Sequence, residues 1–299
     1  LIFNLWAVSA ARRFFLMMMK LYCRRLSLGL CLGLLSCGQQ TESPEVTPIS
    51  TPKEDSELTD VEKEFSRLSA LAAKGHAKSQ TRLAHKYALG KGVKKDMNEA
   101  VRWYRVAGSQ GEPEAQFNLG YMYYNGEGLP RDFVKAVEWF RKSAAQGNAG
   151  AQGSLGLMYD NGEGVPEDNK EALRLYHLGA KNGDMYSQFN LGCIYDSGEM
   201  VPEDNAAAVK WYLKAAAGGH IDVPNYLGLM YDSGEGVTED DVRAYAWWLI
   251  GIDRGDDAPR ANMALLEGKL TAEELDASQK LAEELLKEMQ AKKQPEKKK

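Results

Sequence analysis

The chain has 299 residues, of which 44% are hydrophobic and 26% charged, an ordinary composition for a globular protein. Its formal net charge is −5. The charged residues before Cys37 are all basic: Arg12, Arg13, Lys20, Arg24 and Arg25. Without these five the net charge is −10, so the main part of the chain lacks the basic character that nucleic-acid binding requires.

Residues 1–36 are predicted to be an upstream extension followed by a signal peptide. The start is expected at Met17, Met18 or Met19, which leaves residues 1–16 as the extension. Basic residues then precede an apolar stretch at 26–35, far shorter than the ~20 residues that a membrane-spanning helix needs. A basic segment followed by a short apolar one is typical of a signal peptide.

The apolar stretch ends at Ser36, Cys37 and Gly38. A small residue before a cysteine resembles a bacterial lipobox, which implies that Cys37 becomes the lipidated N-terminus. Ordinary secretion with an unmodified Cys37 is the alternative. By family analogy, Gly38 in place of an aspartate favours the outer membrane over the inner one. We therefore expect a membrane-anchored lipoprotein that faces the periplasm.

Segments that flank the main domain are predicted to be disordered. Residues 37–57 hold the candidate lipidated cysteine and a stretch rich in Thr, Ser, Pro and Glu, which cannot bury a core and is expected to be a tether. Residues 292–299 form a Lys-rich tail. The folded domain is therefore expected at 58–291.

A period of 36 residues runs through this domain. The recurring leucines are Leu83, Leu119, Leu155, Leu191 and Leu227, and the recurring tyrosines are Tyr87, Tyr123, Tyr159, Tyr195 and Tyr231. A fixed period of 20 to 50 residues predicts a stacked repeat array. Because one unit cannot bury its apolar face alone, neighbouring units are expected to share a continuous core.

Each repeat is predicted to be a pair of antiparallel helices, here named helix A and helix B. In the second full repeat, helix A is expected at 114–124, with Leu119 on its buried face and Gly126 at its C-terminal end. Asp132 is expected to cap helix B. Gly120 lies inside helix A, which predicts that a bulky helix-B residue, Trp139 or Phe140, packs against its bare backbone.

Three sequence patterns predict capping boxes, in which a capping side chain and the Glu three residues later satisfy each other's backbone N–H groups. They are Asp96 with Glu99, Asp168 with Glu171, and Thr271 with Glu274. The last one opens a long amphipathic helix to about residue 290, which follows a shorter helix at 259–266.

The domain is expected to begin with a lone helix B and to end with two capping helices. The predicted segments are a half-repeat at 58–78, full repeats at 79–114, 115–150, 151–186, 187–222 and 223–258, and capping helices at 259–291.

The recurring pattern Ala-x-x-x-Leu-Gly-x-x-Tyr, Gly-x-Gly-Val, Asp, Ala, Trp-Tyr and Gly resembles Sel1-like repeats, short relatives of the tetratricopeptide class. The resemblance extends over about residues 58–290. It implies an all-α fold, a right-handed α-solenoid of stacked helix hairpins. It also implies a scaffold that binds another protein or peptide, with no cofactor.

Residues of a catalytic or metal site are not found in a suitable pattern. The four histidines lack metal-ligand spacing. Ser50 and Lys53 match the Ser-x-x-Lys of penicillin-recognising enzymes, but they lie in the proline-rich tether and no Lys-Thr-Gly follows. The paired glycines around Glu163 lack the Lys-Ser/Thr of a phosphate loop. We therefore expect no enzyme, no cofactor and no metal.

In related tetratricopeptide arrays, helix A lines a concave groove. The resemblance therefore implies that the positions around each recurring leucine contact the partner. The candidate residues are Phe117, Asn118, Tyr121, Tyr124, Leu157, Asp160, Phe189, Asn190, Asp196 and Leu229. The alternative is that Phe117 and Phe189 pack between repeats, because helical spacing alone does not assign a face.

The function that we expect is a non-catalytic scaffold or adaptor in the bacterial cell envelope, with an envelope protein or peptide as its partner. It would be held at the membrane by its N-terminal lipid and would not bind nucleic acid. An envelope hydrolase or β-lactam-handling enzyme is one alternative. A scaffold for polysaccharide secretion, by analogy with lipoproteins of this fold, is another.

Overall fold

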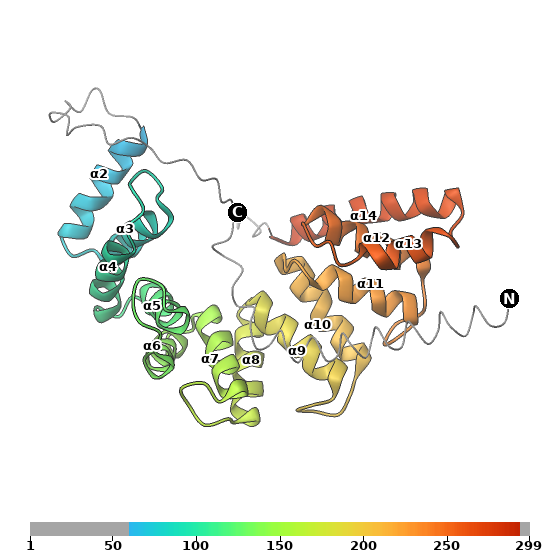
Figure 1. Cartoon of the computed structure of the whole chain (residues 1–299), viewed down its shortest axis with the longest axis horizontal. Coiled ribbons are helices and arrows are strands. Elements are labelled where there is room, and N and C mark those ends of the chain that lie inside the picture. Colours follow the sequence, from blue (N-terminus) through green and yellow to red (C-terminus); the bar gives the residue numbers. More distant parts are fainter. Residues whose placement is uncertain (1–59, 294–299) are drawn as a thin grey trace, which may run out of the picture. The chain divides into compact units, whose positions relative to one another are not determined.

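The computed structural model describes residues 60–293 (Figure 1). The predicted start, signal peptide, lipobox cysteine and tether, and most of the Lys-rich tail, lie outside the described residues. Within 60–293 there are thirteen helices and no strand, which confirms the predicted all-α fold of helix hairpins with a 36-residue period. No helix in this part of the chain is long and apolar enough to cross a bilayer.

The described residues form two compact units. The N-terminal unit is residues 60–167, and the C-terminal unit is residues 168–293. The helices of the N-terminal unit are α2 (Asp60–Ala73), α3 (Ala77–Leu89), α4 (Met97–Ser109), α5 (Pro113–Asn125), α6 (Phe133–Ala145) and α7 (Ala149–Asn161). Each packs on the next one in the chain, so α3, α5 and α7 are A helices and α2, α4 and α6 are B helices.

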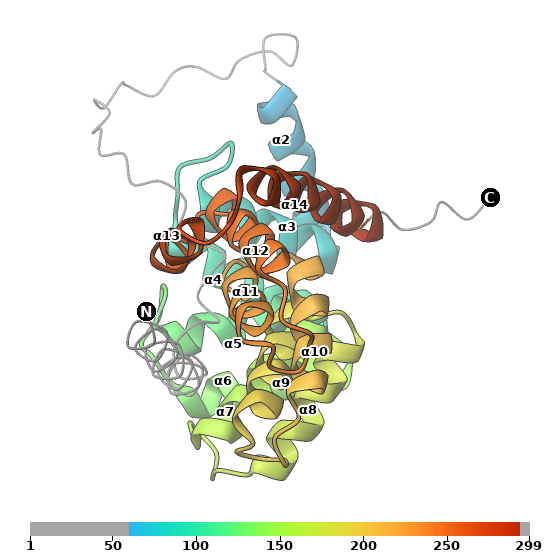
Figure 2. The ribbon, with the colours of Figure 1, turned by 90° about the vertical axis from the view of Figure 1, so that its right-hand side faces the viewer.

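The helices of the C-terminal unit are α8 (Asn169–Lys181), α9 (Met185–Ser197), α10 (Asn205–Gly218), α11 (Val223–Ser233), α12 (Asp241–Asp253), α13 (Arg260–Glu267) and α14 (Ala272–Lys293). Here α9 and α11 are A helices, and α8, α10 and α12 are B helices. The two predicted capping helices are α13 and α14. The long α14 lies along α12 and also contacts α10 (Figures 1 and 2).

Every full repeat has the predicted aspartate N-cap. The caps are Asp96, Asp132, Asp168, Asp204 and Asp240, and each side chain accepts hydrogen bonds from backbone N–H groups in the first turn of its helix B. A cap of this kind contributes about 1 kcal/mol. At the other end of the A helix, Gly126 has φ of 76°, the left-handed conformation predicted for it.

One of the three predicted capping boxes is complete. Thr271 N donates to Glu274 Oε2 at 2.8 Å, and Glu274 N donates to Thr271 Oγ1 at 3.2 Å, which is the complete motif. The prediction was wrong at Asp96. There Glu99 instead binds Arg102 one turn ahead at 2.7 Å, and the Asp96 N–H donates to the carbonyl of Tyr87.

Glu171 at the third site binds Arg174 in the same way, at 2.7 Å. An arginine three residues ahead on the same helix face competes for the glutamate at both sites, and at Asp96 the capping is one-sided. The carboxylates of both aspartates still accept from two backbone N–H groups each.

Glycines within the A helices allow close approach of an aromatic ring, as predicted. A Cβ on Gly120 would lie 2.5 Å from Phe140 Cδ1, so Phe140 rather than Trp139 is the ring in contact. Tyr212 lies against Gly192 and Trp248 against Gly228 in the same way. Such contacts hold helices A and B of one hairpin closer than any side chain on the A helix would permit.

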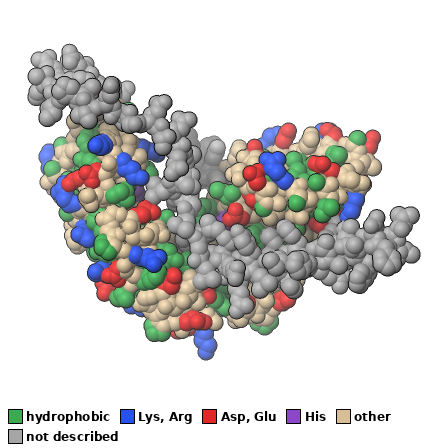
Figure 3. Space-filling view, in the orientation of Figure 1, with side chains coloured by type: hydrophobic (Ala, Val, Ile, Leu, Met, Phe, Trp, Pro, Cys, Tyr) green, Lys and Arg blue, Asp and Glu red, His purple; other side chains and the backbone are tan. Residues whose placement is uncertain are grey.

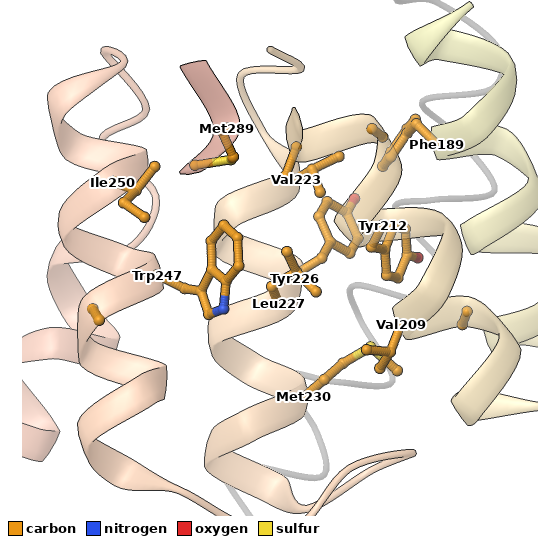
Figure 4. Close-up of a cluster of buried hydrophobic side chains, with 14 of the residues drawn as sticks. Phe189, Val209, Tyr212, Val223, Tyr226, Leu227, Met230, Trp247, Ile250 and Met289 are labelled. Atoms are coloured by element: carbon orange, nitrogen blue, oxygen red, sulfur yellow. The ribbon is translucent and has the colours of Figure 1, made fainter. Parts of the chain in front are cut away.

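The core of the C-terminal unit shows how successive hairpins share one apolar interior (Figure 4). Tyr212 from α10, Tyr226 and Leu227 from α11, and Trp247 from α12 are all buried there. Met289 of α14 closes the same cluster. Since α14 covers the last hairpin with apolar side chains on one face and charged ones on the other, it ends the stack.

Candidate partner-binding surface

The A helix α5 has one packed face and one partly open face. Leu119 and Met122 are buried in the core that α5 shares with α3 and α4. Phe117, Tyr121 and Tyr124 follow one another at helical spacing on the opposite face and are half-buried. We name these three residues the aromatic strip.

Phe117 serves partly as a packing residue. Its ring centroid is 5.9 Å from that of Phe140 on α6, and a Cβ added to Gly150 of α7 would lie 3.1 Å from Phe117 Cζ. The ring therefore lies among three consecutive helices, which is the inter-repeat packing considered as the alternative for this residue.

The polar side chains near the strip differ in their hydrogen bonding. Asn118 Nδ2 donates to the backbone carbonyl of Glu114 at 2.7 Å, within its own helix. Asn125 Nδ2, at the end of α5, has no hydrogen-bond partner among the described residues. The Tyr124 ring contacts Phe133, with 5.4 Å between centroids. The Asn125 amide nitrogen is itself buried, so it is not exposed to a partner beside the strip.

Neighbouring A helices of the N-terminal unit meet along this face. His85 Nδ1 on α3 lies 3.7 Å from Glu114 Oε1 on α5, and Phe117 reaches α7. On α7, Leu157 is buried and Asp160 is half-buried. Of the predicted positions in this unit, Leu157 is therefore enclosed, and those on α5 together with Asp160 are partly open.

The candidate residues of the C-terminal unit are mostly packed. Phe189 is 5% exposed, with its ring 4.4 Å from His220 and 5.4 Å from Tyr226. Leu229 is buried against Trp248 and Met263. Phe189 therefore packs between repeats, which is the alternative given for this residue in the sequence analysis.

The two polar candidates of this unit lie on α9. Asp196 is buried and hydrogen-bonded to Tyr212. Asn190 is half-buried. Full burial of Tyr212, together with the nearby Asp196, raises the pKa of the tyrosine well above its usual value.

A series of buried glutamines, which the sequence analysis missed, joins one hairpin to the next. Gln80, Gln116, Gln152 and Gln188 recur at the 36-residue step, and each Nε2 donates to a carbonyl eight residues earlier, on the preceding B helix, at 3.0 to 3.1 Å. Gln110 and Gln146 donate in turn to the Oε1 atoms of Gln80 and Gln116. Buried polar groups are thereby satisfied at each joint.

The next joint is built differently. Pro224 stands where a fifth glutamine would, and Arg254 Nη1 donates to the carbonyls of Ala216 at 3.0 Å and His220 at 3.4 Å. His220 is 5% exposed and its Nδ1 has no partner in the described residues. Burial first, and then the charge of Arg254, lowers the pKa of His220 to about 4.

Groups that could bind a metal ion were sought in the described part of the chain. Residues 60–293 hold no group of three or more His, Cys, Asp or Glu side chains placed to bind a metal ion. The Ser50–Lys53 pair lies outside the described residues. What the geometry offers instead is an extended face of aromatic and polar side chains on adjacent helices.

Comparison with known proteins identifies the repeat. The model of the Sel1 repeat matches residues 77–112, 113–148, 149–184, 186–220 and 225–256. The first three matches start two residues before the repeats predicted from the sequence, the fourth starts one residue before, and the fifth starts two residues after. No curated protein sequence matches the chain.

Solved structures include close matches. A protective antigen of uropathogenic Escherichia coli with an SLR fold is 36% identical, with TM-score 0.61, over 67% of this chain and 43% of the antigen. The chain thus spans less than half the length of that protein. A Sel1 repeat protein of Oxalobacter formigenes is 32% identical, with TM-score 0.57, over 66% of this chain and 82% of that one.

A Pseudomonas aeruginosa immunity protein, 21% identical with TM-score 0.50 over 68% of this chain and 77% of its own, shares the fold. The family model covers more than half of the chain, and it accounts for the period, the paired helices and the joints between them. The chain belongs to the Sel1 repeat family, whose members are typically non-catalytic scaffolds for protein–protein interaction.

Proposed function

We propose that this chain is a cell-envelope scaffold that holds an extended segment of another protein along the A helices of its N-terminal unit. The observation that carries the proposal is the aromatic strip on α5. Phe117, Tyr121 and Tyr124 remain half-buried on the face opposite the core. Tyrosines bring large contact area and a polar hydroxyl at low entropic cost, which suits a binding surface.

The charged groups near the strip add to this proposal. The rings of the strip can pack on the apolar side chains of an extended ligand. Glu114 and Asp160 flank the strip and favour a partner segment that carries basic residues.

The scaffold is proposed to be anchored by lipid on Cys37 and to face the periplasm, with the outer membrane favoured over the inner one. The support is the order of basic residues, a short apolar stretch and Ser36 before the cysteine. Fractionation of cells that express the Cys37→Ser variant tests the anchor. After a wash at high salt, which removes electrostatic contacts, we expect the variant to leave the membrane fraction, and its retention there would contradict lipid anchoring.

Crosslinking in intact cells tests the binding surface. A photo-crosslinking amino acid replaces Tyr121, and the matched control replaces Glu138, which is exposed on the B helix α6. We expect one discrete protein adduct from position 121 and none from 138, with mass spectrometry identifying the partner. Equal adducts from both positions would mean that the strip has no special role.

A second experiment separates binding from folding. Tyr121→Ala with Tyr124→Ala is expected to lower partner capture about tenfold or more while the helical circular dichroism stays unchanged. Phe117→Ala is expected to destabilise the fold, because its ring packs among α5, α6 and α7. If the tyrosine double variant unfolds as readily as Phe117→Ala, the strip belongs to the core.

A further inference from the structure

The five full repeats differ strongly in charge, and the difference follows their order. In the 36-residue frame that begins at Ala77, the first repeat has eight basic and three acidic residues. The second has four of each, the third has three basic and six acidic, the fourth has two and four, and the fifth has two and eight. The first repeat is therefore the only one of the five with a positive net charge.

The loop between helices A and B concentrates this contrast at matched positions. In the first repeat the loop carries Lys91, Lys94 and Lys95. The equivalents of Lys91 in the other repeats are Glu127, Glu163, Glu199 and Glu235. The equivalents of Lys95 are Arg131, Glu167, Glu203 and Glu239. The loop between helices A and B is thus basic at these positions in the first repeat and acidic at them in the third, fourth and fifth repeats.

The basic loop has a fixed shape. The Lys91 N–H donates to the carbonyl of Lys86, and the Asp96 N–H donates to that of Tyr87, so both ends of the loop are bonded to the end of α3. Gly90 packs closely on Lys95, whose Cβ would lie 3.3 Å from an added Cβ. The three lysines are exposed and have no ion-pair partner within residues 60–293. Their charges therefore point outward from an ordered loop.

Apolar side chains are exposed beside these lysines. Leu89, at the end of α3, is 40% exposed, and Val61, at the start of α2, is 50% exposed. The loop touches α2 directly, because a Cβ on Gly92 would lie 2.6 Å from Val61 Cγ1. We name Val61, Leu89, Lys91, Lys94 and Lys95 the basic edge. In Figure 3, blue side chains are frequent over the region of α2 to α4.

The basic edge lies where the predicted tether enters the fold. α2 begins at Asp60, directly after the segment that follows Cys37, and Val61 is part of the edge. Since the 22 residues between Cys37 and Asp60 span at most about 75 Å, a lipid on Cys37 would keep this end of the array close to the bilayer. The acidic repeats come later in the chain.

We propose that the basic edge docks on an anionic phospholipid surface and so sets which end of the scaffold faces the membrane. Lysines are strongly hydrated point charges that suit a diffuse layer of phosphates, while exposed aliphatic side chains can enter the interface between headgroups and acyl chains. Each lysine near such a surface contributes an attraction that falls off within a Debye length. The inference rests on the proposed anchoring at Cys37 for its orientation, but not for the surface itself.

Lysine footprinting of the full chain on vesicles tests the docking. The amines are acetylated on vesicles that contain phosphatidylglycerol and, separately, on vesicles of phosphatidylcholine alone, and mass spectrometry gives the rate at each lysine. We expect Lys91, Lys94 and Lys95 to react at least about fivefold more slowly on the anionic vesicles, with the difference lost at high salt. Lys170, Lys181 and Lys210, exposed on B helices, are internal controls whose rates should not change.

A variant then tests whether charge causes the protection. Lys91→Glu with Lys95→Glu gives the first loop residues that the third, fourth and fifth loops already carry, so the loop should fold. We expect Lys94 in this variant to react at the same rate on both kinds of vesicle. The matched control is Lys181→Glu with Lys210→Glu, which changes the net charge equally and should leave Lys94 protected.

Three results would overturn the proposal. They are equal rates at Lys94 on anionic and neutral vesicles, protection that survives in the loop variant, and protection without vesicles that grows with protein concentration. The last would identify a second copy of the chain as the occupant. Failure of the anchor is distinguishable, because Cys37→Ser would then stay in the membrane fraction while the vesicle footprint persisted. The lysine footprint does not depend on Tyr121 either, so it tests the docking separately from the proposed binding of a protein segment.

Discussion

The joints between hairpins are built alike in the N-terminal unit and differently at the end of the C-terminal unit. In the N-terminal unit, Gln80 and Gln116 each bridge to the preceding B helix and accept a bond from the following one. At the last joint of the C-terminal unit, Pro224 replaces the glutamine and Arg254 supplies the donor. The acceptor is equivalent in both cases, a carbonyl near the end of a B helix.

The buried carbonyl near the end of each B helix needs a hydrogen-bond donor, and either a glutamine or an arginine side chain can supply it. A buried carbonyl without a donor costs about 1–3 kcal/mol, so a sequence that loses its glutamine needs another donor within reach. The change has local consequences. α11 has 11 residues where α5 and α9 have 13, and the match to the Sel1 repeat is interrupted at 221–224, beside Pro224.

The largest expected effect concerns a contact that both units share. Gly120→Ala in one unit and Gly228→Ala in the other each place a methyl group against a buried ring, Phe140 or Trp248. Overpacking of this kind costs about 3 kcal/mol, less up to about 1 kcal/mol that alanine gains in helix propensity. Urea denaturation should therefore show a lower free energy of unfolding for both variants.

The control for this pair is present in the chain. The first repeat has Ala84 at the equivalent position, fully buried, with Tyr104 as the helix-B ring. Ala84→Gly should cost no more than about 1 kcal/mol. If Gly228→Ala proves as stable as the parent, Trp248 has room to move and the close contact is not required.

Removal of the arginine donor should have an effect of similar size. Arg254→Ala leaves the carbonyl of Ala216 and that of His220 without this donor, and loses the contact with Met289 of α14. Bonds to a charged group contribute about 1.5–3 kcal/mol, so we expect a loss of about 2–3 kcal/mol. Hydrogen exchange should rise in α11, α12 and α14.

The matched variant in the N-terminal unit is Gln116→Ala, which removes neutral bonds to Gly108 and from Gln146. Its expected cost is about 1–2 kcal/mol, with faster exchange in α4 to α6. Equal losses for the two variants would show that the charge of Arg254 adds nothing to the joint.

The elements that repeat could be predicted from the sequence. The hydrogen bonds that long side chains make to backbone carbonyls of the neighbouring hairpin could not. The period, the aspartate caps and the glycine–ring contacts all follow from residue types at fixed spacing. The glutamines also recur at 36 residues, so a signal for them was present, but a lone glutamine in a helix does not reveal which carbonyl it will meet. Arg254 breaks the pattern altogether, and only the fold brings it to Ala216.

The candidate surface was predictable in position but not in exposure. Helical spacing placed Phe117 and Phe189 at equivalent positions, yet the first is half-buried and the second is buried beside His220. The difference comes from His220, at the end of the same repeat, and from Tyr226 of the next repeat, which both pack on Phe189. Neighbours of this kind differ between copies, so the periodic pattern cannot supply them.

A pH dependence is expected in the C-terminal unit. His220 has a pKa of about 4 in the fold, below the ordinary value of about 6.5, because burial and Arg254 disfavour its charged form. The unfolded chain therefore takes up the proton first as the pH falls. Stability is lost as the pH drops through 6.5, and the loss from His220 ends near pH 4. Between pH 7 and pH 5 it should amount to about 1–2 kcal/mol.

Other groups near this joint modify the profile. Burial also lowers the pKa of His177, which adds to the loss with the same sign. Burial raises the pKa values of Asp184, Asp222 and Asp256, which favours the folded state as the pH falls further and so opposes the loss. Denaturation of His220→Asn, which carries the residue found at the equivalent Asn148, should show a flatter profile between pH 7 and 5. An unchanged slope would assign the dependence to other groups.

The smallest expected effect concerns two arginine–tyrosine hydrogen bonds of the N-terminal unit. Arg105 Nη2 donates to the Tyr123 hydroxyl at 3.2 Å, and Arg141 Nη2 donates to that of Tyr159 at 2.7 Å. The equivalents of Arg141 in the C-terminal unit are His177, Leu213 and Leu249. Arg141→Leu therefore introduces a residue that this fold already accepts at the same position.

We expect Arg141→Leu to change the free energy of unfolding by about 0.5 kcal/mol, because the pair is exposed and solvent weakens it. A leucine at this site also gains some apolar contact. The sign of the change in the free energy of unfolding therefore depends on salt, and the variant should be most stable relative to the parent at high ionic strength. Denaturation at low and high salt measures this. A loss above about 1.5 kcal/mol would mean that the arginines fasten the N-terminal hairpins as firmly as the glutamines do, and that the two units differ in strength as well as in chemistry.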